Sequence, residues 1–396
     1  MLVQPTAIRG GTKRSLAPDL ARGLMLLLIA LAHAPVFVAN PNLGPQALNT
    51  VSRFLTVFVA DNLARSMFVF LFGYGLGQLA RSRLAAGAEW PSVRKLLRRR
   101  GFWLLVIGFL HATLLVPIDI ISTYGLALLI TAAMVRARDS VLLWTAAISS
   151  VPATGVIAWQ TVRAHAAAAA GNPETLPSLM KDDFLSQVLI HLMLWPAKVP
   201  ATVLLVLPGI AIGIWAARRR ILDNPEQHVA LLRRVTISFL GLAVVGRLPM
   251  ALIAIGAWKT DATWVPAIAH TLTGFACGIG LAAAVGLIAI KINARIGREA
   301  VLGSDESGRA AEGGWGRVTT ALVALGRRSL TFYLFQSVVF VALFYPFTLN
   351  LAGTMGAAAA HAIGIGTWLL SIVLADWMRR VGHRGPFELV LRRLSR

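Results

Sequence analysis

The sequence predicts an all-α membrane protein, a polytopic bundle of about ten transmembrane helices with its N- and C-termini in the cytoplasm. Composition is the first of three observations behind this prediction. Of the 396 residues, 57% are hydrophobic and 14% are charged, whereas soluble domains carry about 25% charged residues. The mean hydropathy of +0.69 excludes an ordinary soluble enzyme, a disordered chain and a secreted disulfide scaffold. The single cysteine, Cys277, says nothing about compartment.

Long apolar runs are the second observation. A helix needs about 20 apolar residues to cross a bilayer. The expected spans are 20–38, 64–82, 101–117, 119–135, 140–159, 199–217, 235–257, 264–290, 320–345 and 358–378. The first span follows a basic segment, as in a signal peptide, but it is too long and ends without a small-residue cleavage site. We therefore interpret it as a retained helix.

The distribution of basic residues is the third observation. Lys and Arg number 38 against 17 Asp and Glu, a net charge of +21. With a cytoplasmic N-terminus, the inner loops carry most of these cations, whereas the outer loops hold scattered ones such as Arg53 and Lys181. This bias follows the positive-inside rule and predicts a multi-pass protein of the cell (cytoplasmic) membrane, with the lipid bilayer as its partner. Because the cations spread over many loops, we expect no nucleic-acid partner.

The chain is expected to form one transmembrane domain over 1–396, with three peripheral pieces. Residues 160–198 are interpreted as an outer loop, in which the amphipathic stretch 184–195 lies along the membrane surface. Residues 299–317, rich in Gly, Glu and Ser, indicate a flexible inner linker. Residues 379–396 are interpreted as a basic amphipathic inner tail.

The first span carries polar residues on one helical face. Asp19 and Arg22 are three residues apart, and His33 lies eleven residues after Arg22, which places it on the same stripe about 16 Å along the axis. Arg22 is expected near the cytoplasmic surface and His33 in the outer half. Arg22 is either a ligand-binding cation or a snorkelling anchor paired with Asp19. His33 is either functional or a polar residue hydrogen-bonded to a neighbouring helix.

The second span begins near Arg65, with Asp61 four residues earlier on the same helical face as a structural partner. Further along the span, Gly73, Gly75 and Gly77 predict a smooth surface for close helix packing. These glycines are no dinucleotide fingerprint, because no strand precedes them.

The third and fourth spans form a predicted hairpin. His111 lies in the outer half of the first helix, Asp119 starts the next, and Tyr124 follows just over one turn later. A carboxylate beside a histidine fixes the imidazole tautomer and raises its basicity, so this pair is a candidate base with its orienting acid. The alternative is that Asp119 only caps the following helix.

Arg247 lies near the middle of the seventh span. Such a position costs about 2.5–3.5 kcal/mol on insertion scales, so Arg247 needs an anionic partner or a wet cavity. The one acid expected at that depth on another span is Asp119. A structural pair and a ligand-binding cation are both compatible with this residue. The lone histidines His270 and His361 are expected to be structural.

In the ninth span, Tyr333, Gln336 and Ser337 follow the i, i+3, i+4 pattern and form one polar face that must look inward. Gln336 either binds a substrate or joins two helices. The histidines lack metal-ligand spacing and cysteines do not cluster, so we expect no metal. The serines lie in no G-x-S-x-G elbow.

Over nearly the whole chain, the sequence resembles the YeiB-type family, bacterial integral membrane proteins of unknown function. The resemblance rests on the D-x-x-R-G pattern at 19–23, the stretch at 65–75, the His and D-I…Y hairpin at 111–124, GRRSLTFYLFQS at 326–337 and GPFELVLR at 385–392. The chain departs from the family at Ile118, where Gly is usual, and at Phe332, where Asn is usual.

The YeiB-type family in turn resembles membrane acyltransferases that modify sugars, namely the acyltransferase-three group and heparan N-acetyltransferase. In the acyltransferase-three group an Arg is followed, after ten residues, by a His, as in Arg22 and His33. The resemblance implies transfer of an acyl group, by default acetyl, from cytosolic acyl-CoA to an extracytoplasmic sugar, lipid or small molecule. Acyl-CoA would be a co-substrate, not a bound cofactor.

Together, the residues and the resemblance predict two sets of site residues. The predicted catalytic residues are His33, His111 and Asp119. The predicted substrate-binding residues are Arg22, Asp19, Arg65, Tyr124, Arg247, Tyr333 and Gln336. A cation such as Arg22 would contact the CoA phosphates, and Gln336 or Tyr333 would stabilise the developing oxyanion.

Two other classes of function stay open at the level of sequence. In a transporter or exporter of a small molecule or lipid, Arg247 would bind an anion and the histidines would relay protons. A non-enzymatic envelope protein would have neither activity.

Overall fold

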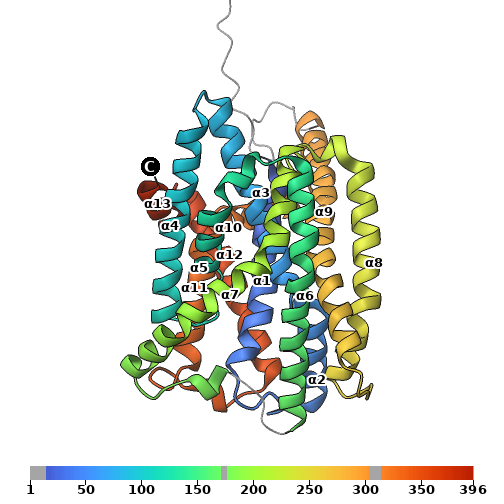
Figure 1. Cartoon of the computed structure of the whole chain (residues 1–396), viewed down its shortest axis with the longest axis vertical. Helices are drawn as coiled ribbons and strands as arrows, with labels where there is room; N and C mark the ends of the chain where they lie inside the picture. The colour runs from blue at the N-terminus through green and yellow to red at the C-terminus, as the bar shows by residue number, and fades with distance from the viewer. Residues whose placement is uncertain (1–14, 171–175, 303–313, 396) are drawn as a thin grey trace, which may run out of the picture.

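The computed structural model describes residues 15–170, 176–302 and 314–395, and within these ranges the chain is helical with no β-strand. Figure 1 shows most of the long helices running roughly along one common axis, as in a membrane helix bundle. The predicted all-α class is therefore confirmed for the described residues.

The bundle is built from long helices and shorter ones. The long helices are α1 (Leu16–His33), α3 (Leu63–Ala85), α4 (Trp90–Leu114), α6 (Asp139–Ala169), α7 (Phe184–Arg218), α8 (Val229–Ala254), α9 (Trp264–Leu302) and α12 (Ala357–Arg380). The shorter ones are α2 (Gln46–Leu55), α5 (Ile121–Thr131), α10 (Gly314–Gly326), α11 (Ser329–Phe344) and α13 (Pro386–Leu394). A π-turn, Thr56–Ala60, follows α2, and 3₁₀ turns lie at Ala34–Phe37, Ala132–Arg136, Leu176–Leu179, Pro225–His228 and Leu351–Gly353.

Within the described ranges, seven helical segments are long and apolar enough to cross a membrane, so the chain is a membrane protein. They are Leu16–Phe37, Gln46–Ala85, Asp139–Ala169, Phe184–Arg218, Pro225–Ala254, Trp264–Arg295 and Ala357–Arg380. The other expected spans are not among these seven segments because of their composition or length. The first half of α4 is strongly basic, and the segments Ile121–Arg136 and Ser329–Phe344 are apolar but shorter.

Helices extend into the region expected to be an outer loop. Helix α6 continues to Ala169, and α7 begins at Phe184. The amphipathic stretch is therefore continuous with a spanning helix, and Figure 1 shows the first part of α7 crossing the lower bundle obliquely before it rises. Pro196 and Pro200 lie inside this helix, and proline bends such helices where neighbouring groups satisfy the freed carbonyls.

The start of α7 is capped by Asp183, whose carboxylate accepts a hydrogen bond from the Ser186 backbone N–H at 2.9 Å. Hydrogen bonds from Ser186 hold the pKa of the Asp183 carboxyl below its usual value.

Two further segments differ from the expected organisation or lie partly outside the described residues. Helix α2 lies outside every expected span, because 46–55 is only ten residues long and half of these residues are polar. The expected linker 299–317 lies partly outside the described residues, which end at 302 and resume at 314.

Glycines allow a close helix contact between α3 and α7. A Cβ atom on Gly73 would lie 2.3 Å from the carbonyl oxygen of Ile210, and one on Gly77 would lie 2.5 Å from Cβ of Ala217. Contacts this short exclude any side chain larger than hydrogen. The smooth packing face predicted for the second span is therefore confirmed at Gly73 and Gly77, whereas Gly75 faces α1.

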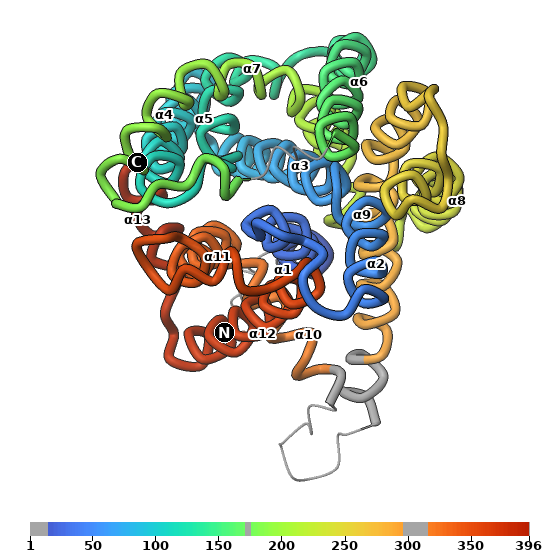
Figure 2. Tube along the Cα trace, turned by 90° about the horizontal axis from the view of Figure 1, so that it is seen from below, coloured from blue at the N-terminus to red at the C-terminus, as the bar shows by residue number. Residues whose placement is uncertain are grey.

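A second glycine contact brings α4 against the start of α5. A Cβ atom on Gly108 would lie 2.1 Å from the backbone nitrogen of Ser122. His111 follows Gly108 by just under one helical turn, so it is held beside the beginning of α5. Figure 2 shows α3 in the middle of the bundle, with α1 on one side and α4, α5 and α7 on the other. The candidate site lies among these elements and α11.

Candidate functional site

A chain of hydrogen bonds joins three helices inside the bundle. His111 of α4 bonds through Nδ1 to Oδ1 of Asp119, which precedes α5, at 2.8 Å, and through Nε2 to Oγ of Ser337 on α11 at 2.8 Å. The side chains of His111 and Asp119 are 0% and 2% exposed, and Ser337 is also buried. Acid, imidazole and hydroxyl therefore form one buried line.

Asp119 both caps α5 and orients His111. Its Oδ1 also accepts the backbone N–H of Ile121 at 3.0 Å, and its Oδ2 accepts that of Ser122 at 2.7 Å. A carboxylate that receives such N–H groups acts as an acceptor, so we assign the imidazole proton to Nδ1. The lone pair on Nε2 then faces the hydroxyl of Ser337, which donates to it.

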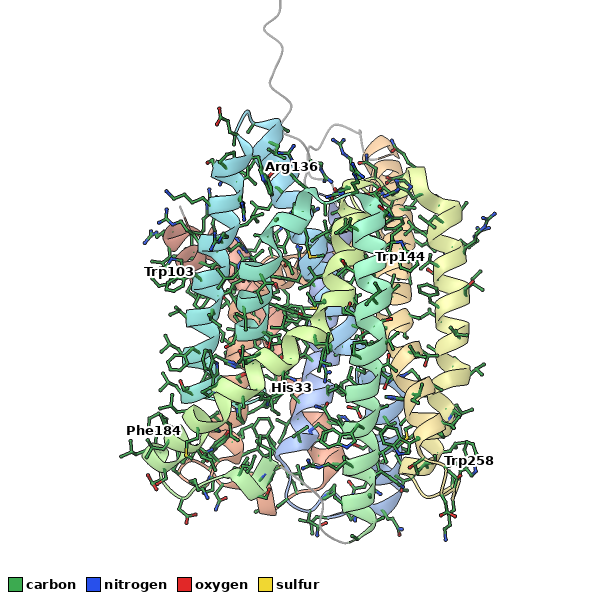
Figure 3. All side chains as sticks on the ribbon, in the orientation of Figure 1. His33, Trp103, Arg136, Trp144, Phe184 and Trp258 are labelled. Carbon is green, nitrogen blue, oxygen red and sulfur yellow. The ribbon has the colours of Figure 1, made fainter. Side chains whose placement is uncertain are left out.

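Tyr333 connects His33 to this line. Its ring centroid lies 5.3 Å from that of His111 and 6.4 Å from that of His33. The Tyr333 hydroxyl donates to the carbonyl oxygen of Ile118 at 3.1 Å. His33 is half-buried at the C-terminal end of α1, in the lower half of the bundle as drawn in Figure 3.

Cationic and phenolic groups complete the assembly. His33 interacts electrostatically with His111, Arg65 and Lys198, and Arg65 interacts with Tyr124 and Asp61. The ring of Tyr124 stacks on Phe72 at 4.3 Å. We call the following residues the histidine cluster: His33, Arg65, His111, Asp119, Tyr124, Lys198, Tyr333 and Ser337. The structure thus brings most of the predicted site residues together.

Two donors of the histidine cluster are not used by the protein itself. Within the described chain, the buried hydroxyl of Tyr124 and the buried Nη1 of Arg65 have no hydrogen-bond partner. Buried polar atoms are almost always paired in proteins, and an unpaired one costs about 1–3 kcal/mol. These two donors of the cluster therefore make no hydrogen bond to the described part of the protein.

Arg22 and Asp19 lie at the opposite end of α1 from His33. Nη1 of Arg22 donates to Oδ1 of Asp19 at 2.9 Å, and Nε of Arg327 donates to Oδ2 of the same carboxylate at 3.2 Å. Arg100 interacts electrostatically with Arg22. The pairing of Arg22 with Asp19 is present, and it stands within a group of three arginines, which we call the arginine cluster: Arg22, Arg100 and Arg327.

Gln336 lies between these two groups. Its Nε2 donates to the carbonyl oxygen of Leu26, in the middle of α1, at 3.2 Å. It therefore joins α11 to α1, as one of the two sequence interpretations expected. Its Oε1 is buried without a partner among the described residues.

Arg247 is not part of the histidine cluster, and the expectation that Asp119 is the acid near it was wrong. Its guanidinium donates to the carbonyl oxygens of Val57, Phe58 and Asp61 at 2.6, 2.7 and 2.7 Å. The acid in electrostatic contact is Asp61. The π-turn after α2 leaves backbone carbonyls without regular helical partners, and inside a membrane these must be satisfied by the protein. Arg247 does so.

His270 and His361 also hydrogen-bond to this region, as the structural interpretation expected. Nε2 of His270 bonds to the carbonyl oxygen of Val57 at 2.9 Å. His361 bonds through Nε2 to the carbonyl oxygen of Leu31 at 3.0 Å and through Nδ1 to Ser52. Among the residues that the structure describes, no three His, Cys, Asp or Glu side chains converge as metal ligands.

Sequence reasoning missed the roles of Ser337 and Lys198. Ser337 was placed on the inward face but not in the site, because its contact with His111 joins helices far apart in the chain. Lys198 was assigned to an outer loop, yet its Nζ donates to the carbonyl oxygen of Pro117 at 2.7 Å, and the lysine interacts electrostatically with Asp119. Its position just before Pro200 on α7 was the one available signal.

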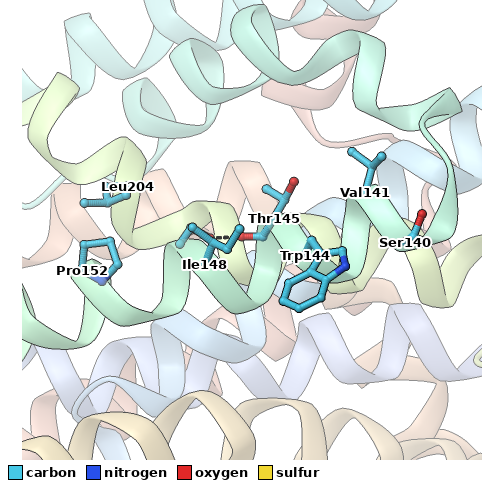
Figure 4. Close-up of a pocket in the computed structure, with 8 residues that line it drawn as sticks. Ser140, Val141, Trp144, Thr145, Ile148, Pro152 and Leu204 are labelled. Atoms are coloured by element: carbon cyan, nitrogen blue, oxygen red, sulfur yellow. Dashed lines mark hydrogen bonds between the residues drawn. The ribbon is translucent and has the colours of Figure 1, made fainter.

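A groove on the outside of α6 is separate from the histidine cluster. Figure 4 shows its lining, which is mostly apolar: Ser140, Val141, Trp144, Thr145, Ile148, Ser149, Pro152 and Leu204. Trp144 is 67% exposed and Ile148 is 66% exposed. None of the lining residues is titratable, so the groove has no means of acid–base chemistry.

The fold and these polar clusters define a helical membrane protein with a buried Asp–His–Ser line in its interior. Residues 308–396 match the sequence profile of a family described as "Protein of unknown function (DUF418)". This region holds GRRSLTFYLFQS and GPFELVLR, so the YeiB-type resemblance is confirmed for the last part of the chain. No curated protein matches the chain, and no solved structure matches it.

Proposed function

We propose that this protein is a membrane acyltransferase that moves an acyl group, acetyl by default, from cytosolic acyl-CoA to an extracytoplasmic sugar, lipid or small molecule. The observation that carries the proposal is the histidine cluster, in which the rings of His33 and His111 both lie against Tyr333 and His111 is oriented by the buried carboxylate of Asp119. General bases of this kind contribute about 10²–10⁴-fold to proton-transfer reactions.

The proposal includes ten membrane crossings in the cytoplasmic membrane, with both termini in the cytoplasm. In Figure 3, Arg136 lies at the upper end of the bundle, and Phe184 and Trp258 lie at the lower end, an arrangement that supports the orientation in this proposal. The basic residues of α4 and of the α7–α8 connection belong to the upper end. By the positive-inside rule, the upper end is cytoplasmic.

In this orientation the donor binds at the arginine cluster. Arg22, Arg100 and Arg327 would bind the phosphates of CoA, since guanidinium groups pair with phosphate oxygens through two parallel hydrogen bonds. The thioester would extend from this cluster along α1 towards His33. The acyl-CoA is a co-substrate, and Asp19 positions the arginines around it.

At the histidine cluster, His33 accepts the proton of the acceptor hydroxyl or amine as that group attacks the acyl carbonyl. We expected Gln336 or Tyr333 to stabilise the oxyanion, but Gln336 Nε2 and the Tyr333 hydroxyl already donate to Leu26 and Ile118. The donors of Tyr124 and Arg65, which have no partner in the described structure, take that role in this proposal. Preorganised donors at a developing oxyanion usually lower the barrier to acyl transfer more than any other single feature of a site.

The test is a transfer assay on the full-length protein in lipid nanodiscs. Labelled acetyl-CoA is offered with a panel of sugar, lipid and amine acceptors, and labelled product and free CoA thiol are measured. His33→Ala is expected to lose about 10²–10⁴-fold in transfer rate while staying folded. His383→Ala, which changes an exposed histidine outside the cluster, is the matched control.

Full transfer by His33→Ala would contradict this assignment. If folded wild-type protein binds no acyl-CoA and instead carries out substrate flux in liposomes, the protein is a transporter. If the folded protein shows neither acyl transfer nor substrate flux, that result would indicate the envelope-protein alternative.

A further inference from the structure

We propose that Ser337 is a nucleophile that carries the acyl group as a covalent ester, with His111 as its base and Asp119 as the acid that orients the base. The identity of the acyl donor rests on the proposed function, but the assignment of Ser337 as nucleophile with His111 and Asp119 does not. Acyl transfer by this protein would then proceed in two half-reactions.

Asp119, His111 and Ser337 have the order and geometry of an orienting acid, a base and a nucleophile. Carboxylate, imidazole and hydroxyl follow one another at 2.8 Å and 2.8 Å, within the range expected of a nucleophile and its base. Asp119 fixes the tautomer of His111 with the proton on Nδ1, so the lone pair of Nε2 faces the hydroxyl of Ser337. This is the arrangement by which serine enzymes on unrelated folds activate their nucleophile, and it is recognised by geometry and not by sequence position.

Three other buried serines hydrogen-bond within their own helices. Ser66, Ser149 and Ser371 each donate to a carbonyl oxygen four residues back in their own helix, at 2.7, 2.5 and 2.7 Å. This is the ordinary way in which a helical serine inside a membrane is satisfied. The corresponding carbonyl of Tyr333 is 3.5 Å from Ser337 Oγ, so the hydroxyl is directed to His111 instead.

The histidine cluster also holds two donors that could stabilise an oxyanion. A serine nucleophile needs donors for the oxyanion that forms on the attacked carbonyl. The buried Tyr124 hydroxyl and Arg65 Nη1 have no hydrogen-bond partner in the described structure. Tyr124 interacts electrostatically with Tyr333, Arg65 and Asp119, which places its phenol within the same cluster as the proposed nucleophile.

In the first half-reaction, Ser337 Oγ attacks the carbonyl carbon of the acyl thioester as its proton passes to His111 Nε2. The carbon–sulfur bond breaks, and CoA leaves as the thiolate, which takes a proton from water. In the second half-reaction, the acceptor oxygen attacks the serine ester and its proton passes to His33. The carbon–Oγ bond breaks, Oγ takes the proton held by His111, and His33 returns its proton to water.

The decisive experiment treats full-length protein in nanodiscs with an alkyl fluorophosphonate. This probe forms a phosphorus–oxygen bond at an activated serine as fluoride leaves, whatever the natural donor. We expect one adduct by intact mass, located at Ser337 by peptide mapping. Ser337→Ala and His111→Ala are expected to lose it, and Asp119→Asn, which reverses the tautomer, should slow labelling on the order of 10³–10⁴-fold. Ser371→Ala is the matched control and should label as wild type.

A second arm uses acetyl-CoA on the same preparations. Wild-type protein should acquire an acetyl ester at Ser337, and His33→Ala should accumulate it, because its acceptor step is blocked. If Ser337→Ala does not fold, Ser337→Cys in a Cys277→Ala background replaces it and should form a hydroxylamine-sensitive thioester at position 337.

The outcomes separate this inference from the proposed function. Phosphonate labelling of Ser337 without acetylation or acyl-CoA binding would support Ser337 as a nucleophile and would contradict acyl-CoA as the donor. Full acetyl transfer by folded Ser337→Ala would overturn the covalent step and keep the transferase. No phosphonate adduct at Ser337 on folded protein, together with no acetyl ester in His33→Ala, would show that the line is structural.

Discussion

Arg247 shows how one side chain can stabilise an irregular turn inside the membrane. It is 1% exposed, and it donates to three carbonyl oxygens of the π-turn region that no regular helix bond satisfies. The partners are backbone atoms, so a search of the sequence for acids at the same depth did not find them. A cation that is anomalous in the sequence is an ordinary hydrogen-bond donor in the structure.

We therefore predict that Arg247→Leu destabilises the protein by about 3–5 kcal/mol, because it leaves buried carbonyl groups without donors. The measurement is thermal unfolding in detergent. Arg233→Leu, an exposed position on the same helix α8, is the control and should change stability little. Equal stability of the two variants would mean that the π-turn does not depend on Arg247.

The histidine cluster could be predicted in part from residue types alone. His111 with Asp119 was recognised because the two flank one short turn, and His33 because a histidine in an apolar helix is costly. The contact of His111 with Ser337 spans 226 positions in the chain, and no local pattern encodes it. Asp119 was predicted either to cap α5 or to orient His111, and the structure shows that its oxygens do both.

At the scale of elements, glycine decides which helices approach most closely. Gly73 of α3 and Gly213 of α7 lie in one tight contact, in which an added Cβ would meet backbone atoms of the opposite helix at 2.3 Å and 2.2 Å. Lipid offers helices no hydrophobic drive to associate, so such close packing supplies much of the attraction between them.

Gly73→Ala is predicted to destabilise the protein by about 1–3 kcal/mol, since α3 and α7 must separate to accept the methyl group. Gly241→Ala on α8 is the matched control, because its Cβ would meet nothing within 4 Å, and it should be neutral or slightly stabilising. Unfolding temperatures of the two variants, measured side by side, check this. A Gly73→Ala protein as stable as the control would rule out the tight contact.

Helices could be predicted where a long apolar run identifies a membrane span, and they could be predicted less well elsewhere. The long spans were located because a run of about 20 apolar residues matches the thickness of a bilayer and is rare in soluble helices. Helix α2 was missed because Gln46–Leu55 is only ten residues long and half of these residues are polar. It is held by contacts such as that of Ser52 with His361. The continuity of α7 through Pro196 was also missed, since proline in a soluble helix usually marks its end.

At the scale of the whole molecule, the account requires a defined orientation in the membrane. We predict that a cysteine at Ala257, in the α8–α9 connection, reacts with a membrane-impermeant maleimide in intact cells. A cysteine at Ala86, between α3 and α4, should react only after the membrane is permeabilised. Both changes are made in a Cys277→Ala background, because Cys277 is the natural thiol. The reverse labelling pattern would place the arginine cluster outside and exclude it as a site for cytosolic CoA.

The proposed function requires that the arginine cluster binds an acyl-CoA whose acyl group reaches the histidine cluster. The most direct measurement is binding of acetyl-CoA to purified wild-type, Arg22→Ala and Arg234→Ala proteins, with free CoA as competitor. We expect saturable binding that free CoA displaces and that Arg22→Ala weakens. Arg234→Ala, which changes an exposed arginine on α8, should leave the binding unchanged. No binding of acetyl-CoA or longer acyl-CoAs by folded wild-type protein would contradict the claim.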